Sequence, residues 1–332
     1  MKAMLTEDLD QRIRAFQESR VLLTAIELDL FEALGGGAAA ADVAGRLGTD
    51  PRATEMLLNA LAGLALVESR DGIFRNTPET AQYFTRRSPD DVRLAMMHTV
   101  HLWQTWSTLT ECVRTGTTQG RLSGGGGDWT GAFIAAMHAN ASRRAASVVE
   151  AVDGTGVRKM LDVGGGSGAY SIAFAQANPA LHAEILDVGD VVPIARGHID
   201  EAGLADRVVA REGDLRTSDF GTGFDLVLIS AICHMLDPDE NRALLARSYS
   251  ALGAGGRIAI SDFILDPDRS GPRQATLFAL NMLVGTRRGN TYTEEEYASW
   301  LREAGFGAIR RVALPGPAHL MIGSRPIHSR DT

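Results

Sequence analysis

Apolar residues recur at helical spacing along the first hundred residues. Between Gln11 and Leu34 they fall mostly three or four positions apart, which is the pattern of one face of an α-helix. The glycines at 35–37 end this predicted helix. Shorter apolar stretches predict two more helices, over 41–47 and 52–66, separated by a Gly-Thr-Asp-Pro break.

A hairpin is expected next, around Asp71-Gly72. Helix, turn, helix and hairpin in this order are typical of a winged-helix unit, which often binds DNA. Residues 1–100 hold 11 Lys and Arg against 15 Asp and Glu, a net charge of −4. The phosphate contacts that dominate DNA affinity would lack their cations. We therefore expect a dimerisation and scaffold role rather than DNA binding.

Two longer helical stretches follow, over 91–114 and from Trp129 to Val152. Thr115 to Gly127 is rich in Gly, Ser and Thr, which predicts a mobile loop between them.

From Lys159 onward, apolar runs of strand length alternate with helical patterns. Strands are predicted over Met160–Val163, Ala183–Leu186, Val208–Arg211, Phe224–Ile229 and Arg257–Ile260, with a last one over His319–Gly323; helices are predicted over Ala169–Ala177, Val191–Ala202, Pro238–Leu252 and Thr293–Ala304. Repeated strand-helix units predict an α/β fold, with a parallel sheet covered by helices on both faces.

Composition supports a folded protein of about two domains. The chain has 332 residues, 45% of them hydrophobic, and a net charge of −8. No apolar run is long enough to span a membrane, and the first ten residues carry acids where a signal peptide would be basic. Cys112 and Cys233 are too few for a disulfide framework. These features predict a soluble, cytoplasmic protein that does not bind membranes.

The strongest motif is a glycine loop between the first of these strands and its helix. Leu161-Asp162-Val163 is followed by Gly164-Gly165-Gly166-Ser167-Gly168. Glycine allows a tight turn and close approach of a ligand to the backbone. Gly164, Gly166 and Ala169 also satisfy the dinucleotide pattern, so the glycines alone do not distinguish NAD from S-adenosylmethionine.

Two acids narrow this choice. Asp187 ends the second strand, 19 residues after Gly168, where a carboxylate can accept both hydroxyls of an adenosine ribose. Asp214 follows the third strand, where it can accept from an adenine amino group. Combined with a helical front half, this spacing favours S-adenosylmethionine over NAD.

With these motifs, the chain resembles the small-molecule O-methyltransferases that carry an N-terminal winged-helix dimerisation domain, of the plant caffeate and hydroxyindole type and their bacterial relatives. The resemblance spans nearly the whole sequence. It implies a Rossmann-like methyltransferase sheet with an N-terminal all-α winged-helix domain, and a homodimer. The implied domains are 1–110 for dimerisation, 111–155 for connecting helices and a pocket lid, and 156–332 for S-adenosylmethionine.

The resemblance also implies which residues bind the cofactor. Gly164, in the loop with Gly166, would meet its methionine part and Asp187 its ribose. The other implied cofactor residues are Asp214 and Leu215 at the adenine, with Val188 and Ser230 beside them. Plant members often carry Lys where Ser230 stands.

His234 is the candidate catalytic base. It follows the strand Phe224–Ile229, so it should lie at the carboxyl edge of the sheet, where ligands bind in open α/β folds. A histidine suits deprotonation of a hydroxyl because its ordinary pKa is about 6.5. The family uses a histidine at this place as its general base, and Asp262 matches an acid that orients it.

Three positions depart from the family pattern. Met235 and Leu236 replace an Asp-Trp pair, and a second acid is absent near Thr291. His234 is thus expected to have one carboxylate partner, and other nucleophiles remain open.

The methyl acceptor is expected to be a small, aromatic metabolite bound between the helical region and the sheet domain. Met137 and Met282 match family positions that clamp an aromatic ring. Helix spacing adds nearby candidates, of which Trp103, Phe133 and His138 complete the predicted substrate site.

Three alternatives remain open. His98 and His101 share a helix face and raise a metal site, but no histidine lies between His234 and His319 to add a ligand, so no metal is predicted. Methylation of an enolizable carbon, as in relatives acting on 2-oxo acids, is the second alternative. The third is a member that retains S-adenosylmethionine without transferring its methyl group.

Overall fold

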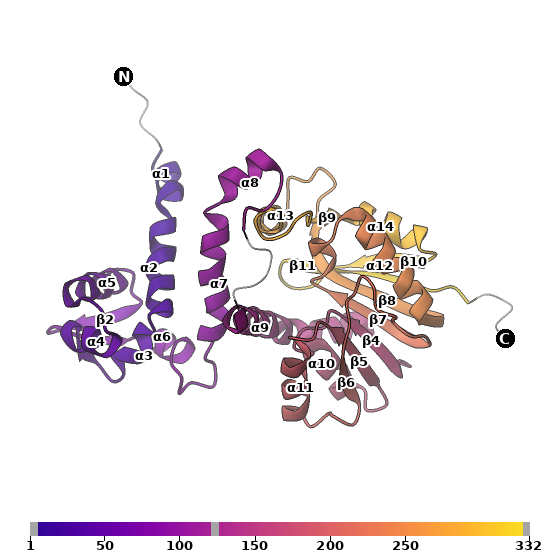
Figure 1. The fold of residues 1–332 in the computed structure, drawn as a ribbon, viewed down its shortest axis with the longest axis horizontal. Coiled ribbons are helices and arrows are strands. Elements are labelled where there is room, and N and C mark those ends of the chain that lie inside the picture. Colours follow the sequence, from indigo (N-terminus) through magenta and orange to yellow (C-terminus); the bar gives the residue numbers. More distant parts are fainter. Residues whose placement is uncertain (1–5, 121–125, 328–332) are drawn as a thin grey trace, which may run out of the picture. The chain divides into compact units, whose positions relative to one another are not determined.

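The computed structural model of the protein describes residues 6–120 and 126–327. The chain divides into two compact units, one made of Met1–Trp103 with Gly131–Ala136 and the other of Gln104–Thr130 with Met137–Thr332. Figure 1 labels the helices and strands of both.

The first unit is mainly helical and contains a small three-stranded sheet. Its elements are α1 (Glu7–Arg14), α2 (Phe16–Glu27), α3 (Leu30–Leu34), β1 (Ala38–Ala39), α4 (Ala40–Leu47), α5 (Pro51–Gly63), β2 (Val67–Arg70), β3 (Ile73–Asn76), α6 (Pro78–Tyr83) and most of α7 (Arg93–Trp106). Strands β2 and β3 pair as the predicted hairpin around Asp71-Gly72, which is confirmed. Leu30, Phe31 and Leu58 are among the buried side chains of its core.

The single helix predicted from Gln11 to Leu34 is wrong, because this stretch forms three helices. Asp29 separates α2 from α3 and has a left-handed backbone with φ of 59°, which a right-handed helix cannot contain. Its carboxylate accepts hydrogen bonds from Arg86 and Arg93. These contacts between distant segments stabilise a conformation that local apolar spacing does not reveal.

The helix predicted over 91–114 is likewise two helices, α7 and α8 (Leu109–Thr115). Just before α8, both the backbone N–H and the hydroxyl of Thr108 donate to the Thr105 carbonyl, three residues back, so the i→i−4 pattern of an α-helix is interrupted here. Helix α9 (Gly126–Val152) begins three residues earlier than predicted. Of the predicted loop from Thr115 to Gly127, residues 121–125 lie outside the described residues.

The second unit is built on a sheet of strand order β10-β11-β8-β7-β4-β5-β6. The strands are β4 (Lys159–Val163), β5 (His182–Asp187), β6 (Val208–Glu212), β7 (Phe224–Ser230), β8 (Leu252–Leu265), β10 (Gly307–Val312) and β11 (Ala318–Ser324), with the short β9 (Tyr292–Thr293) paired to β8. Strands β4 to β8 run parallel, and β10 and β11 are antiparallel. The six predicted strands are confirmed, whereas the sequence pattern does not predict β9 or β10.

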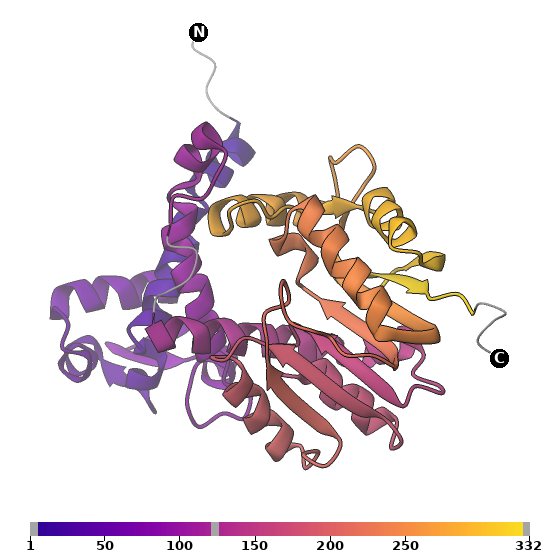
Figure 2. The same ribbon diagram turned by 45° about the vertical axis from the view of Figure 1, so that its right-hand side comes forward.

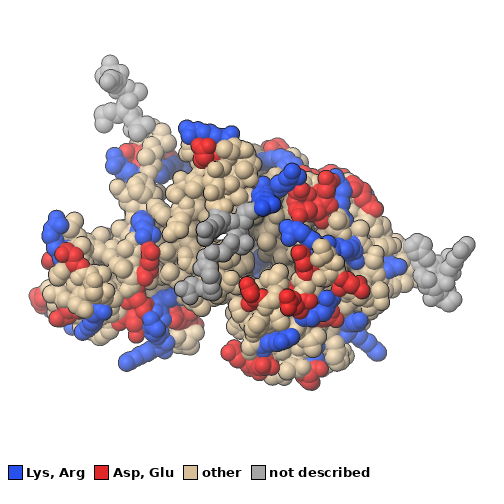
Figure 3. Space-filling view, in the orientation of Figure 1, with Lys and Arg blue, Asp and Glu red and all other residues tan. Residues whose placement is uncertain are grey.

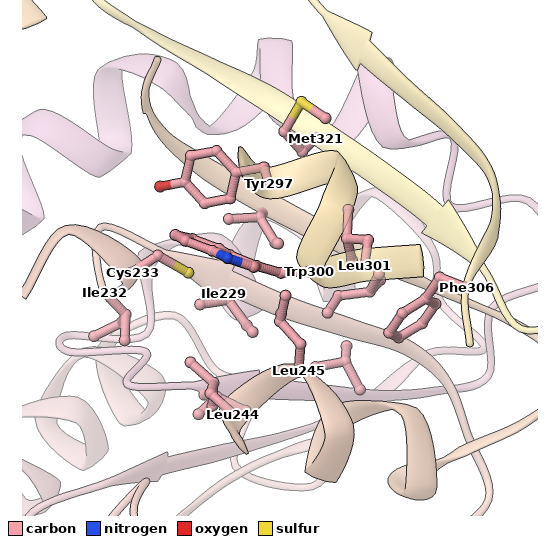
Figure 4. Close-up of a cluster of buried hydrophobic side chains, with 14 of the residues drawn as sticks. Ile229, Ile232, Cys233, Leu244, Leu245, Tyr297, Trp300, Leu301, Phe306 and Met321 are labelled. Atoms are coloured by element: carbon pink, nitrogen blue, oxygen red, sulfur yellow. The ribbon is translucent and has the colours of Figure 1, made fainter. Parts of the chain in front are cut away.

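Helices cover both faces of this sheet, as Figure 2 shows. They are α10 (Ala169–Ala177), α11 (Val192–Glu201), α12 (Pro238–Ala251) and α14 (Glu294–Glu303), with α9 before the first strand and α13 (Arg273–Gly285) after β8. Alternate residues of a strand point to opposite faces. Leu161 accordingly packs in the cluster of α12 and α14, and Met160 in that of α9, α10 and α11. Figure 4 shows the first cluster around Trp300.

Strand β4 lies between β5 and β7. The chain continues from β4 to β5 and β6 on one side and then crosses back to β7 on the other side, so the strand order reverses at β4. In open α/β sheets, ligands bind at such a switch point, beyond the carboxyl ends of the strands. The glycine loop and the segment around His234 follow β4 and β7, so they begin at this edge.

Acidic and basic side chains are interspersed on the face drawn in Figure 3, with no continuous basic surface on the first unit. Within the described ranges no helix is long and apolar enough to cross a membrane. Cys112 and Cys233 are both buried and unbonded to each other. A cytoplasmic location stays a prediction.

Candidate active site

The glycine loop needs glycine for steric reasons. Gly164, Gly166 and Gly168 have φ of 68°, 58° and 79°, in the left-handed region that side chains disfavour. A Cβ on Gly164 would lie 2.4 Å from Cδ1 of Ile232, and one on Gly168 would lie 2.7 Å from Cδ1 of Ile185. The loop therefore turns tightly against the sheet and against the segment that follows β7.

Asp187 closes the other side of the loop. Its two carboxylate oxygens accept the backbone N–H of Gly166 and of Val188, each at 2.8 Å. Burial raises the pKa of Asp187, and these two hydrogen bonds lower it in part. Each oxygen keeps a lone pair, so the carboxylate can accept two ligand hydroxyls. Val188 is exposed next to it.

Asp162 is an acid at this site to which the sequence pattern gives no role. It is fully buried beneath the glycines, and its Oδ2 accepts the Ser171 hydroxyl at 2.7 Å. Its Oδ1 has no partner among the described residues. Burial, supported by the charge of Asp187 and opposed by the Ser171 bond, raises the pKa of Asp162 to about 7. An acid two residues before the first glycine is the signal in the sequence that could have identified it.

These features fit the predicted cofactor. S-adenosylmethionine carries a cationic amino-acid part and a ribose diol, and the loop offers an unpaired buried carboxyl oxygen together with free lone pairs on Asp187. The backbone at Gly164 has no room for a side chain, because Ile232 already occupies that space. The residues present therefore suit this group.

The predicted adenine residues lie on the loop after β6. Asp214 is exposed, and its carboxylate accepts the N–H of Arg216 at 2.7 Å. The Leu215 carbonyl accepts from Arg247, whose guanidinium also lies 4.9 Å from the centre of the Phe220 ring. Arg247 on α12 thus anchors this loop, a contact that the sequence does not reveal.

The segment from Ser230 to His234 turns sharply after β7. Ala231 has a left-handed backbone with φ of 57°, and its N–H donates to the Ser261 carbonyl at 2.9 Å. Such strain in a residue with a side chain is frequent at functional sites. The turn carries Ile232 toward Gly164 and His234 toward Asp262 on β8.

The His234 ring is oriented by Asp262. Oδ1 of Asp262 lies 2.7 Å from Nδ1 of His234 and also accepts the Phe263 N–H, so this oxygen acts as an acceptor and Nδ1 carries the proton. Oδ2 accepts the backbone N–H of His234 at 3.1 Å. In the neutral ring, Nε2 is then free to accept a proton.

Neighbouring groups fix the same histidine. The Phe278 ring meets it edge-on, with centroids 4.7 Å apart, and the Asn290 N–H donates to its carbonyl at 2.9 Å. Thr291 is buried and donates to the Ala275 carbonyl. Within the described part of the chain, Asp262 is the one carboxylate bonded to the His234 ring.

The five residues predicted to bind the acceptor lie in different surroundings. Met282 is buried on α13, one turn after Phe278, and so belongs to the helix that packs against His234. His138 instead meets the glycine loop, with Nδ1 2.9 Å from the Ser167 hydroxyl, and Met137 precedes it on α9.

Trp103 and Phe133 belong to the first unit. The Arg20 guanidinium lies 5.7 Å from the Trp103 ring centre, and Phe133 packs edge-on against His98. Among the described residues no group of three or more His, Cys, Asp or Glu could hold a metal ion.

Two family models match the chain. The O-methyltransferase domain matches residues 106–307, and the O-methyltransferase dimerisation domain matches residues 11–86.

Three similar proteins are named as methyltransferases. The 3-hydroxy-5-methyl-1-naphthoate 3-O-methyltransferase of Streptomyces sahachiroi is 36% identical over 90% of this chain and 89% of its own. The tetracenomycin polyketide synthesis 8-O-methyl transferase of Streptomyces glaucescens is 33% identical over 96% of each. The L-tyrosine C(3)-methyltransferase of Streptomyces lavendulae is 30% identical over 89% of this chain and 86% of its own.

Solved structures share the whole fold. PigF with SAH superposes with a TM-score of 0.89 and 28% identity, covering 97% of this chain and all of that one. Human N-acetylserotonin methyltransferase in complex with SAM gives 0.84 and 26%, covering 98% and 100%.

Proposed function

Because the chain belongs to the O-methyltransferase family, we propose that it transfers a methyl group from S-adenosylmethionine to a hydroxyl of a small aromatic metabolite, with His234 as the general base. The observation that carries this proposal is the His234–Asp262 pair, which ends in an accepting Nε2. His234 lies on the segment after β7, and Ile232 of the same segment packs against the glycine loop.

The cofactor, when bound, supplies an electrophilic methyl group. The proposed binding residues are Gly164 and Gly166 with Asp162 for its amino-acid part, Asp187 and Val188 for the ribose, and Asp214, Leu215 and Ser230 for the remainder. Positive φ at the two glycines, the unpaired Asp162 oxygen and the free lone pairs of Asp187 support the roles of these four residues. The other roles stay predictions from the resemblance.

The chain's own chemistry is proton transfer. His234 Nε2 takes the proton as the acceptor O–H bond breaks, and the oxygen becomes the nucleophile. Asp262 keeps the proton on Nδ1 and stabilises the imidazolium that forms, because its negative charge lies 2.7 Å away. Phe278 contacts the His234 ring, and Met282 is buried one turn further along α13; both are side chains of a kind that suits a flat ring.

An aromatic acceptor is also supported by relatives. The similar proteins include enzymes named for a naphthoate and for a tetracenomycin polyketide. Met137, His138, Trp103 and Phe133 stay predicted acceptor residues.

We further propose a homodimer formed through the N-terminal domain. The dimerisation model covers residues 11–86. Leu9, Ile13 and Phe16 are 45%, 56% and 54% exposed and recur at helical spacing, so they offer an apolar stripe to a second copy.

The base is tested by His234→Ala. We expect the turnover of a hydroxylated aromatic acceptor to fall about 100-fold or more, while calorimetric affinity for S-adenosylmethionine stays within about threefold. The exposed His182→Gln is the matched control and should keep wild-type turnover. Wild-type turnover in His234→Ala would contradict the proposal.

Carbon methylation is the second candidate, favoured by the similarity to the L-tyrosine C(3)-methyltransferase. A phenol whose oxygen has been deprotonated can also react at a ring carbon, so the same base would serve. Methyl-labelled cofactor and product NMR distinguish the two, since an oxygen-bound methyl and a carbon-bound methyl have different carbon shifts. An acceptor oxygen left unmethylated would favour the second candidate.

A further inference from the structure

Tyr297 is a buried tyrosine whose hydroxyl has no partner within 3.5 Å in the described part of the chain, although the Asp262 carboxylate is close enough to act on it. It lies on α14 with none of its surface exposed. Figure 4 shows its ring between Cys233, Trp300 and Met321. An unsatisfied buried hydroxyl is costly, so it should form a bond with an acceptor within reach.

Asp262 has one accepting position left. Its carboxylate already takes three protons, from the His234 ring, the His234 N–H and the Phe263 N–H. An ionised carboxylate offers about four such positions. It is itself buried, which makes a fourth donor from the protein the way to satisfy it.

Strand geometry directs Asp262 toward Tyr297. Ile260, Asp262 and Ile264 alternate on one face of β8, and both isoleucines pack in the cluster that contains Tyr297. The adjacent β9 pairs Tyr292 with Ile264, and the Tyr292 ring meets Tyr297 edge-on at 6.1 Å. The hydroxyl and the carboxylate thus share one dry face of the sheet.

The electrostatic environment agrees with this arrangement. Burial first, and then the negative charge of Asp262, raise the pKa of Tyr297 well above its ordinary value. The phenol therefore keeps its proton and can only be the donor toward that carboxylate.

We propose that Tyr297 is a positioning residue whose hydroxyl donates the fourth hydrogen bond to Asp262 and thereby fixes the carboxylate that orients His234. This inference rests on the proposed role of His234 as the base. A donor on Asp262 withdraws negative charge from it, so the imidazolium is stabilised less and the ring stays neutral, and able to accept, to lower pH.

Other titratable groups face the pair from the elements around it. Cys233 and Tyr292 also lie in this cluster, and burial raises the pKa of both well above their ordinary values. Neither group changes charge near neutral pH. Asp237 and Glu296 act on Tyr292 but are not bonded to the His234 ring.

The test compares Tyr297→Phe with Tyr292→Phe. Both remove one phenol oxygen from the same cluster, but the Tyr292 hydroxyl donates to the Leu236 carbonyl at 2.5 Å. Nitrogen NMR of labelled protein follows the His234 ring through a pH titration. In Tyr297→Phe we expect its midpoint to move upward by about half to one pH unit, the equivalent of one hydrogen bond. The acid limb of the kcat profile should move equally, with an unchanged KM for S-adenosylmethionine.

Two further arms decide the outcome. In Tyr292→Phe, and when Tyr297→Phe is added to Asp262→Asn, the midpoint should not move. Fluorotyrosine at position 297 keeps the packing and is a stronger donor, so it should move the midpoint downward. Unchanged midpoints in both Tyr297→Phe and the fluorotyrosine protein, or equal shifts in the two Phe variants, would overturn the inference. The NMR readout needs no turnover, so it stays separate from a failure of the base in His234→Ala.

Discussion

Ile232 occupies the space beside Gly164 that a side chain at position 164 would need. Its Cδ1 lies 2.4 Å from the place of a Cβ on Gly164, closer than nonbonded carbon atoms approach each other. Ile232 belongs to the segment that carries His234, and Gly164 to the loop of the cofactor site. The packing of one residue therefore couples the position of the base to that of the predicted methyl donor.

Gly164→Ala should for this reason weaken cofactor binding more than Gly166→Ala. Both positions have positive φ, which costs about 1 kcal/mol for alanine, but only position 164 also meets a neighbour within 4 Å. We expect at least about tenfold weaker S-adenosylmethionine binding in Gly164→Ala by calorimetry. Adding Ile232→Ala should restore a large part of it, because the clash is removed. Equal losses in the two glycine variants, with no rescue, would show that the contact with Ile232 does not matter.

Site residues that directly follow or end a predicted strand could be located from the sequence. The glycines after β4 and Asp187 at the end of β5 lie where strand ends place them, because parallel strands bring their carboxyl ends to one edge. Asp262 is indicated by the family resemblance, and it lies within β8, three residues before the end of that strand. Over residues 6–120 and 126–327, Asp262 is the one carboxylate bonded to the His234 ring, in agreement with the expectation.

Contacts between residues that are far apart in the sequence could not be predicted from it. Tyr297 looks like an ordinary core position of an amphipathic helix, and only the fold brings α14 beneath β8. Asp29 breaks a helix through ion pairs with residues more than 50 positions away. His138 has a helical spacing that suits an acceptor site, yet its ring bonds Ser167.

His138 gives a pH-dependent prediction of its own. Burial, and then the neighbouring His198 stacked at 4.0 Å, lower the pKa of His138. The unfolded chain therefore takes up this proton before the folded one, and stability is lost as pH falls below about 6.5. In His138→Gln this part of the acid sensitivity should be absent from the free energy of unfolding measured from pH 7.5 to 5.5.

The same variant should bind S-adenosylmethionine about three- to tenfold more weakly, since the loop loses one hydrogen bond through Ser167. The exposed His182→Gln serves as control and should retain both the wild-type affinity and the wild-type acid sensitivity. If His138→Gln unfolds with the same pH dependence as the wild type, the buried, stacked environment of His138 does not govern its proton uptake.

Asp162 predicts the opposite dependence. Burial raises the pKa of its carboxyl to about 7, whereas the unfolded chain releases this proton near the ordinary value of 3.8. Between these values the folded protein holds a proton that the unfolded protein lacks, so stability falls as pH rises, by roughly 1.4 kcal/mol per pH unit for one proton. Asp162→Asn cannot release that proton and keeps a polar partner for the Ser171 hydroxyl. In urea unfolding at pH 5, 6 and 7, the free energy of unfolding of the variant should thus increase relative to that of the wild type by about 1 kcal/mol or more at each step.

The exposed Asp219→Asn is the control for Asp162→Asn, and its free energy of unfolding should show no such relative increase. Parallel curves for Asp162→Asn and wild type would mean that Asp162 is already ionised in the folded protein at pH 5, and that its unpaired oxygen is satisfied by water.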